Sequence, residues 1–164
     1  MLSDQEYGNF RVEFEWKLPE RGNSGFAIRA PLFGDPAFDG MELQMVDTRY
    51  FPADEPPKPS ELSGALYRAV APRVQVYKPD AWNKYEITVR GSHIKVIFNG
   101  VPVQDVDVDR EVMHPKRHDG TDAPALKDRP RRGHIGFQEL SRGGGHVQIR
   151  NIKFSDESAV PARP

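Results

Sequence analysis

The sequence predicts an all-β protein, an antiparallel sandwich or barrel, on three observations. Residues 10–17 alternate strictly between apolar and charged side chains, which is the period of a half-buried antiparallel strand. Two-residue turn signals at 91–92 and 99–100 divide residues 82–106 into three alternating runs, as in a hairpin meander. No segment sustains helical periodicity, and many short strands separated by turns are typical of a sandwich or barrel.

In chain order, each run of alternating or β-branched residues between turn signals is assigned as a strand. The expected strands are Phe10–Lys17, Gly25–Ala30, Met41–Val46, Ala65–Val70, Trp82–Arg90, Ile94–Phe98, Val101–Val106, His134–Gln138 and His146–Phe154. Their apolar sides predict a buried core that includes Phe14, Trp16, Ile28, Ile87, Val89, Val96, Phe98, Ile135, Ile149 and Phe154.

Two polar stretches interrupt this rhythm. Residues 51–62 contain four prolines, and residues 107–132 are long and strandless. Because long loops in compact domains often carry function, we expect the 107–132 loop to border a cleft and to be more mobile than the strands.

Length and composition limit the kind of protein. A chain of 164 residues suits one domain, here a sandwich over 1–155 with a flexible tail over 156–164. The absence of cysteine excludes disulfides and thiolate metal sites. The net charge of −1, with both signs interspersed, gives no nucleic-acid footprint. No apolar run approaches the roughly 20 residues of a membrane span, so no membrane insertion is expected.

Two further features of the sequence bear on localisation and on metal binding. Residues 1–4 lack the apolar region of a signal peptide, so a periplasmic or secreted location would require a signal that has been removed. His114-x-x-x-His118-Asp119 has a metal-like spacing. It lies in a proline-flanked loop rather than on a helix, so the spacing does not make the ligands converge, and no metal site is assigned there.

The strand Met41–Val46 carries the main chemical candidates. Glu42 and Gln44 point to one face, opposite Leu43 and Met45. Asp47 joins the polar face only if the strand bulges by one residue. Two carboxylates on one face could act as acid and base, or as acid and nucleophile. The alternative is an ordinary solvated strand face.

Neighbouring strands offer further polar and aromatic groups. Arg29 alternates with Ile28, so its side chain should face outward. There its guanidinium could donate two hydrogen bonds to substrate hydroxyls or pair with Glu42. Tyr67 and Trp82 are rigid plates that could stack on sugar rings. For Trp82, core packing is the stronger alternative. We therefore expect Arg29, Glu42, Gln44, Asp47 and Tyr67 to converge on one concave surface.

Several short segments, in this order, resemble one family across residues 7–154. They are Tyr7-Gly8-Asn9-Phe10, Glu13-Phe14-Glu15-Trp16, Asn23-Ser24-Gly25-Phe26 with Arg29, Glu42-Leu43-Gln44-Met45-Val46-Asp47, Gly64-Ala65-Leu66-Tyr67 before Ala71-Pro72, Lys78-Pro79 before Trp82-Asn83, Asn99-Gly100, Gly133-His134-Ile135-Gly136-Phe137-Gln138 and Arg150-Asn151-Ile152-Lys153. The ordered set is similar to the 3-keto-disaccharide hydrolase domain family. The resemblance implies a concanavalin A-like jelly-roll sandwich of two antiparallel sheets and a carbohydrate substrate oxidised at C3.

A 3-keto group makes the C2 proton acidic, so a base can remove it, the C1 substituent leaves, and water adds to the enone. The hypothesis assigns Glu42 or Asp47 as base with the other as acid, and Arg29 as the group that stabilises the oxyanion. A divalent metal could replace Arg29. The predicted substrate-binding residues are Gln44, Tyr67, Trp82, Asn83 and Gln138. A direct two-carboxylate glycoside hydrolase, a non-catalytic carbohydrate-binding module and an interaction domain remain as alternatives.

Overall fold

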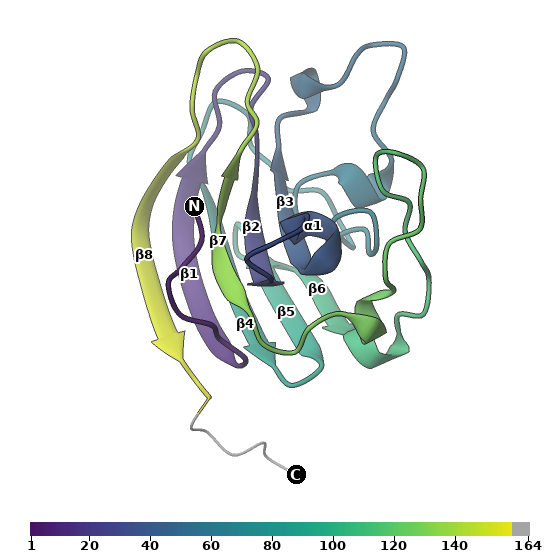
Figure 1. The fold of residues 1–164 in the computed structure, drawn as a ribbon. Helices are drawn as coiled ribbons and strands as arrows, with labels where there is room; N and C mark the ends of the chain where they lie inside the picture. The colour runs from purple at the N-terminus through teal and green to yellow at the C-terminus, as the bar shows by residue number, and fades with distance from the viewer. Residues whose placement is uncertain (159–164) are drawn as a thin grey trace.

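A computed structural model describes residues 1–158 as two antiparallel β-sheets packed face to face (Figure 1). The strands are β1 (Phe10–Lys17), β2 (Asn23–Ala30), β3 (Met41–Val46), β4 (Asn83–Arg90), β5 (His93–Phe98), β6 (Val101–Asp107), β7 (His134–Glu139) and β8 (Gln148–Asp156). The longest helix is α1 (Pro36–Asp39), and four 3-10 turns follow it at Thr48–Tyr50, Pro59–Glu61, Val108–Arg110 and Leu126–Asp128. The predicted all-β jelly-roll sandwich is confirmed.

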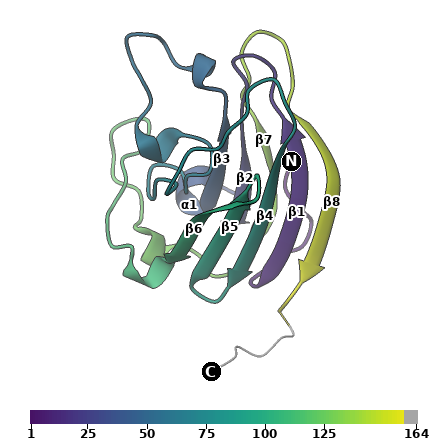
Figure 2. The same cartoon turned by 180° about the vertical axis from the view of Figure 1, so that it is seen from behind.

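The two sheets differ in width. The five-stranded sheet has the order β6-β5-β4-β1-β8, and the three-stranded sheet has the order β3-β2-β7. Figure 2 shows the wide sheet from behind, with β6 and β8 at its edges. Figure 1 shows α1 beside β3 and the two long loops beyond that strand. The outward side chains of β3 are buried, whereas those of β5 are exposed. The narrow sheet is therefore the one whose outer face is covered by loops.

Aromatic side chains from both sheets fill the core. Phe14 of β1 lies 5.3 Å from the ring of Phe26 in β2 and 5.0 Å from that of Phe137 in β7. Trp16 stacks at 5.7 Å on Tyr77, with an interplanar angle of 7°. Burial of such rings is the main favourable term in folding. The strict alternation of β1 thus places its apolar side between the sheets, as predicted.

Seven of the ten predicted core residues are fully buried, and the other three lie at the margin of the core. Phe154 is 38% exposed, and Ile135 and Ile149 are only partly buried. Phe154 and Ile149 lie on β8, the outermost strand of the wide sheet. An edge strand has a neighbour on one side only, so its inward side chains are covered less completely.

The predicted strand Ala65–Val70 is also wrong. Leu66 and Val70 exchange backbone hydrogen bonds of 3.0 and 2.9 Å, so the chain turns back on itself. Arg68 at the bend has a φ of +57°. Leu66 still forms one bridge with Leu43 of β3, which places this turn at the outer edge of the narrow sheet.

The last strand continues into the predicted C-terminal tail. Asp156 and Glu157, assigned to the predicted tail, are described, and Asp156 is the last residue of β8; residues 159–164 of that tail lie outside the described residues. The prediction of one domain over 1–155 stays a prediction. Within the described chain, no helix is long and apolar enough to cross a membrane.

Candidate functional site

A cleft of about 510 Å³ opens on the outer face of the narrow sheet, a size typical of small-molecule sites. Its floor comes from β2, β3 and β7, and its walls come from the loops around α1, the 47–68 segment and the 107–132 loop. The lining residues are Asn23, Asp35, Ala37, Glu42, Gln44, Tyr50, Phe51, Pro52, Glu55, Glu61, Tyr67, Arg68, His118, Gln138, Leu140 and Arg142. The expectation that the 107–132 loop borders the cleft is confirmed through His118.

Strand register arranges the floor in rows. Gly25 of β2 pairs with Gln44 on one side and with Gln138 on the other. A Cβ atom at Gly25 would lie 2.5 Å from Cδ of Glu42, which is too close for two carbon atoms. The Glu42 side chain therefore lies across a gap that only glycine leaves open, between the two glutamines.

Glu42 is the most unusual group of the cleft. It is 4% exposed, and none of the described residues donates a hydrogen bond to its carboxyl group. Burial, followed by the charge of Asp35, raises the pKa of Glu42 to about 8. An unpaired buried carboxyl in a cleft is costly to maintain, and such groups occur preferentially at functional sites.

Amide side chains supply the polar contacts of the floor. Oε1 of Gln44 accepts the backbone N–H of Met45 at 3.0 Å, and its NH₂ group makes no hydrogen bond to a described residue. Oδ1 of Asn23 is buried without a hydrogen-bond partner among the described atoms. Gln138 completes the floor from β7. Together these amides offer both donors and acceptors, the pattern that hydroxyl recognition needs.

Tyr67 lies where the sequence placed it, facing outward beside Glu42. Its backbone N–H donates to the carbonyl of Glu42 at 2.9 Å. Its ring packs edge-on against Phe38 at 5.9 Å. Burial is the largest cause that raises the pKa of Tyr67 to about 12. The phenol is therefore a hydrogen-bond donor at neutral pH rather than a base.

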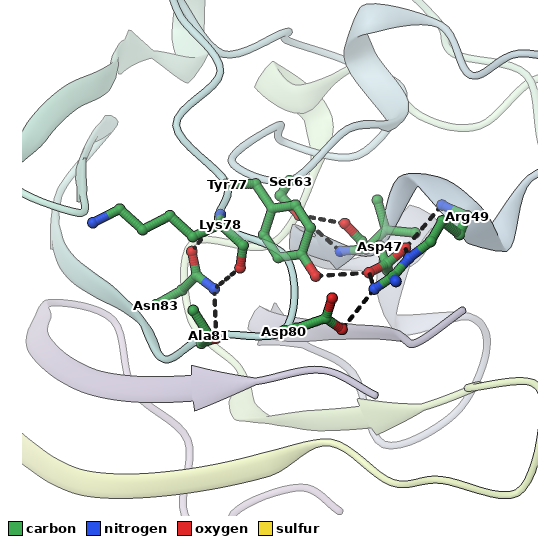
Figure 3. Close-up of polar contacts among 9 residues, drawn as sticks. Asp47, Arg49, Ser63, Tyr77, Lys78, Asp80, Ala81 and Asn83 are labelled. Atoms are coloured by element: carbon green, nitrogen blue, oxygen red, sulfur yellow. Dashed lines mark hydrogen bonds and ion pairs between the residues drawn. The ribbon is translucent and has the colours of Figure 1, made fainter. Parts of the chain in front are cut away.

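Asp47 does not join the cleft, so its predicted place on this surface is wrong. The β2–β3 pairing runs without a bulge from Asn23↔Val46 to Ile28↔Met41, so parity puts Asp47 on the face opposite Glu42. Its carboxylate accepts two bonds from the Arg49 guanidinium, at 2.8 and 2.7 Å, and one from Tyr77 Oη at 3.1 Å (Figure 3). Burial would raise the pKa of Asp47, but these donors outweigh it and lower the pKa.

Arg29 does not reach the cleft either. The β2–β7 register shifts between Ala27 and Ala30, and Arg29 has a φ of +53° within this bulge. Its guanidinium is 1% exposed and donates to the carbonyls of Gly8 and Gly91. Simple alternation fails at this residue because a bulge turns the side chain away from the expected face.

The last two predicted contacts lie elsewhere as well. Trp82 precedes β4, and the Arg150 guanidinium covers its ring at 3.8 Å from the centroid, on the outer side of the wide sheet. Asn83 is buried and binds Lys78 through both its amide atoms, each at 2.9 Å (Figure 3). Asn83 thus clamps a loop, and neither residue lines the cleft.

Sequence reasoning missed several wall residues. Asp35 caps α1 by accepting the N–H of Ala37 at 3.0 Å, and the Asp-Pro pair before an apolar residue is a recognisable signal of a helix start. Arg142 stacks over Tyr50 at 4.3 Å and joins two loops. His118 was considered only as a metal ligand. Loop residues such as Arg142 and His118 give no periodic signal that would predict their neighbours.

No metal centre is found in the part of the chain that the structure describes, because no three His, Asp or Glu side chains there gather closely enough to hold an ion. His114 and His118 diverge. Nδ1 of His114 lies 3.0 Å from the carbonyl of Ala123, whereas His118 turns to the cleft.

The solved structures that resemble this fold include three with the following similarities. A Parabacteroides distasonis protein, provisionally described as a glycosyl hydrolase, is 28% identical with a TM-score of 0.78, over 94% of this chain and 81% of that one. A second protein of that organism, described likewise, is 22% identical with a TM-score of 0.74, over 94% and 75%. The carbohydrate-binding module CBM66 of Bacillus subtilis is 12% identical with a TM-score of 0.50, over 93% and 78%. The last two show the fold alone.

Among curated proteins, none matches this sequence. A family model does match, and it describes a 3-keto-alpha-glucoside-1,2-lyase-like domain over residues 1–155. That range covers both sheets except the last residue of β8, includes every residue of the cleft, and confirms the resemblance drawn from the ordered segments. This chain therefore belongs to the 3-keto-alpha-glucoside-1,2-lyase-like domain family.

Proposed function

We propose that this protein is a carbohydrate-active enzyme that cleaves the glycosidic bond of 3-keto-glycosides by elimination followed by hydration. The observation that carries the proposal is Glu42, a buried carboxyl without a hydrogen-bond partner among residues 1–158, on the floor of a cleft. A carboxyl with a purely structural role would be expected to have partners. The family and the glycosyl hydrolase description of the 28% identical relative support the same class of substrate.

The reaction divides into two halves. In the elimination, a base takes the proton from C2 to give an enolate, the C1–O bond breaks, and an acid protonates the departing oxygen. In the hydration, water adds to C1 of the enone while C2 regains a proton. The sum is hydrolysis of the glycoside, and it needs one proton donor, one proton acceptor and a group that stabilises the enolate.

Glu42 fits the role of the proton donor. With a pKa of about 8, it still holds its proton at neutral pH and can pass it to the departing oxygen. The resulting carboxylate then takes a proton from the water that attacks C1. Its operating pKa lies near the working pH, which favours proton transfer in both directions. The elimination rate should therefore fall as the pH rises through about 8.

The amides of the floor fit the binding and enolate-stabilising roles. Gln44 lines the cleft, and its NH₂ group, which has no partner among the described residues, is available to the C3 oxygen, on which charge develops. Asn23 and Gln138 offer an acceptor and a further amide to ring hydroxyls. Arg29, assigned the enolate-stabilising role from the sequence, makes its hydrogen bonds to Gly8 and Gly91 instead.

A direct hydrolase that uses Glu42 and Asp47 as its carboxylate pair has less support. Such a mechanism needs both carboxyls on the same bond of one substrate. Asp47 is fully buried, on the opposite face of β3, and is held by Arg49 and Tyr77. The two carboxyls therefore do not face one cleft.

The test is a product assay with 3-keto-glucosides beside their unoxidised parents. We expect cleavage of the oxidised compounds only, since only they have an acidic C2 proton. Glu42→Gln should lower the cleavage rate by about 10²–10⁴-fold. Glu86→Gln, on the outer face of the wide sheet, is the matched control and should keep the wild-type rate.

Two results would contradict the proposal. Cleavage of the unoxidised parents at the same rate would point to a direct hydrolase. Tight binding of a 3-keto-glucoside without turnover, unchanged by Glu42→Gln, would identify a carbohydrate-binding module instead.

A further inference from the structure

The proposed elimination needs a base, and two of the four carboxylates that line the cleft are already engaged. Both oxygens of Glu61 accept hydrogen bonds, from Arg68 Nε at 2.8 Å and from the backbone N–H of Lys58 at 3.0 Å. Asp35 accepts a backbone N–H of α1 at 3.0 Å. The imidazole of His118, in contrast, lines the cleft without a hydrogen bond to any residue that the structure describes.

The tip of the 107–132 loop is a hydrogen-bonded turn. The backbone N–H of Arg117 donates to the carbonyl of Thr121 at 2.8 Å, and Gly120 N–H donates to the carbonyl of Arg117 at 3.1 Å. The Arg117 guanidinium binds Asp39 Oδ1 at 2.5 Å and lies 5.6 Å from the centre of the Phe38 ring. The turn is thereby tied to α1, and the residue after Arg117 is held at the cleft.

Aromatic contacts orient the His118 ring itself. It meets Phe38 edge to face at 5.5 Å and 81°. It lies 6.0 Å from the ring of Tyr67, whose backbone N–H donates to the carbonyl of Glu42. These contacts place the His118 ring beside Tyr67, and both residues line the same cleft as Glu42. Neither ring nitrogen of His118 makes a hydrogen bond to a described residue.

We propose that His118 is the base that removes the C2 proton of a 3-keto-glycoside in this cleft. The inference rests on the proposed function and adds its second proton-transfer group. Neutral imidazole takes the C2 proton, and the C–H electron pair becomes the enolate. The enolate then expels the C1 oxygen, which receives the proton of Glu42. In the hydration, the Glu42 carboxylate takes a proton from water and the imidazolium returns one to C2, so both groups regain their starting states.

Exchange of the C2 proton separates this role from that of Glu42. The probe is 1,5-anhydro-3-keto-glucitol, which has a C2 proton beside the ketone but no leaving group at C1. Its exchange in D₂O is followed by proton NMR, with the enzyme-free rate subtracted. We expect wild-type protein to accelerate the exchange and Glu42→Gln to retain most of it, while losing cleavage of 3-keto-glucosides.

His118→Gln should lower both exchange and cleavage by about 10²–10⁴-fold, the usual contribution of a general base. The matched control is His114→Gln in the same loop, whose Nδ1 faces the Ala123 carbonyl outside the cleft; it should keep both activities. His118→Asn is a second variant, and an unchanged melting temperature for both variants shows that the loss is not a loss of fold.

The outcomes are distinguishable. If His118→Gln exchanges and cleaves like the wild type, the role of His118 is refuted while the proposed function stands. If Asp35→Asn or Glu55→Gln abolishes exchange and His118→Gln does not, that carboxylate is the base and the inference falls. If wild-type protein neither cleaves 3-keto-glucosides nor exchanges the probe, the proposed function falls together with it.

Discussion

The outer faces of the two sheets carry similar residue types but very different electrostatics. On the wide sheet, Glu13 lies between Lys84 at 3.6 Å and Lys153 at 3.1 Å, and Glu86 lies between Lys84 at 3.4 Å and Arg11 at 3.7 Å. The hydrogen bond from Lys153, above all, lowers the pKa of Glu13.

On the narrow sheet, Glu42 has the same outward position in its strand, yet burial raises its pKa to about 8. The two glutamates differ because loops cover only the sheet that contains Glu42. Loops beside α1 and the 47–68 segment enclose the narrow sheet, whereas water reaches the wide one. An outward glutamate therefore becomes a candidate acid only where the tertiary structure removes water and withholds a cation.

The two faces share one core, so truncation of that core should have the largest effect on both. Phe14 is fully buried between the sheets. Phe14→Ala should lower the free energy of unfolding by about 3–5 kcal/mol, as for other buried aromatic residues. Phe33, which is 88% exposed, provides the control, and Phe33→Ala should leave the melting temperature unchanged. Thermal unfolding measures the melting temperatures, and denaturant unfolding measures the free energies. Equal values for the two variants would contradict the assignment of Phe14 to the core and of Phe33 to the surface.

The pH dependence of stability sharpens the contrast between the two glutamates. The folded Glu42 keeps its proton up to about pH 8, whereas the unfolded chain releases it near the ordinary value of 4.5. Stability should therefore fall as the pH rises from about 4.5 to 8 and then level off. Since one pKa unit corresponds to about 1.4 kcal/mol, Glu42→Gln should gain about 3–5 kcal/mol at pH 9 relative to pH 4.

Urea unfolding of wild type and Glu42→Gln at pH 4, 7 and 9 measures this gain. A difference between the two proteins that stays constant over this range would mean that Glu42 titrates normally and has water or a cation beside it.

Adding one methyl group at Gly25 should disturb the cleft without changing the number of charged groups. Gly25→Ala puts a Cβ 2.5 Å from Cδ of Glu42, so the carboxyl must move. A shift of about 1 Å in a catalytic group can cost about 10²-fold in rate, and we expect a loss of that order in 3-keto-glucoside cleavage. Gly8→Ala meets only one atom, at 3.5 Å, and should retain the wild-type rate. Equal rates for both variants would show that Glu42 does not act from this position.

We expect the smallest effect on stability from a substitution on the outer face of the wide sheet, where the charges are paired. Glu13 has a lowered pKa and pairs with two exposed lysines, Lys84 and Lys153, so its ion pairs stabilise the fold only above its ordinary pKa and are lost as the pH falls. Exposed pairs contribute little in salt. We expect Glu13→Gln to leave the melting temperature unchanged at pH 7 and 0.15 M salt. A large drop would mean that the wide sheet, too, depends on its charges.

Alternation along the chain was enough to determine much of this protein. It predicted β1 and β3 to the residue, the burial of Phe14 and Trp16, and the outward direction of Glu42 and Gln44. These features depend on period-2 geometry, which a strand imposes on its own residues whatever surrounds it. The ordered segments also identified the family.

The membership of the cleft was decided only by the tertiary structure. A bulge that alternation cannot reveal turned Arg29 away, and the regular β2–β3 register kept Asp47 on the other face. His118 reached the site because Arg117 binds Asp39, a residue 78 positions away in the chain. The pKa of Glu42 likewise depends on walls that come from distant loops. Such long-range contacts follow from how the whole chain packs, and local periodicity carries no record of them.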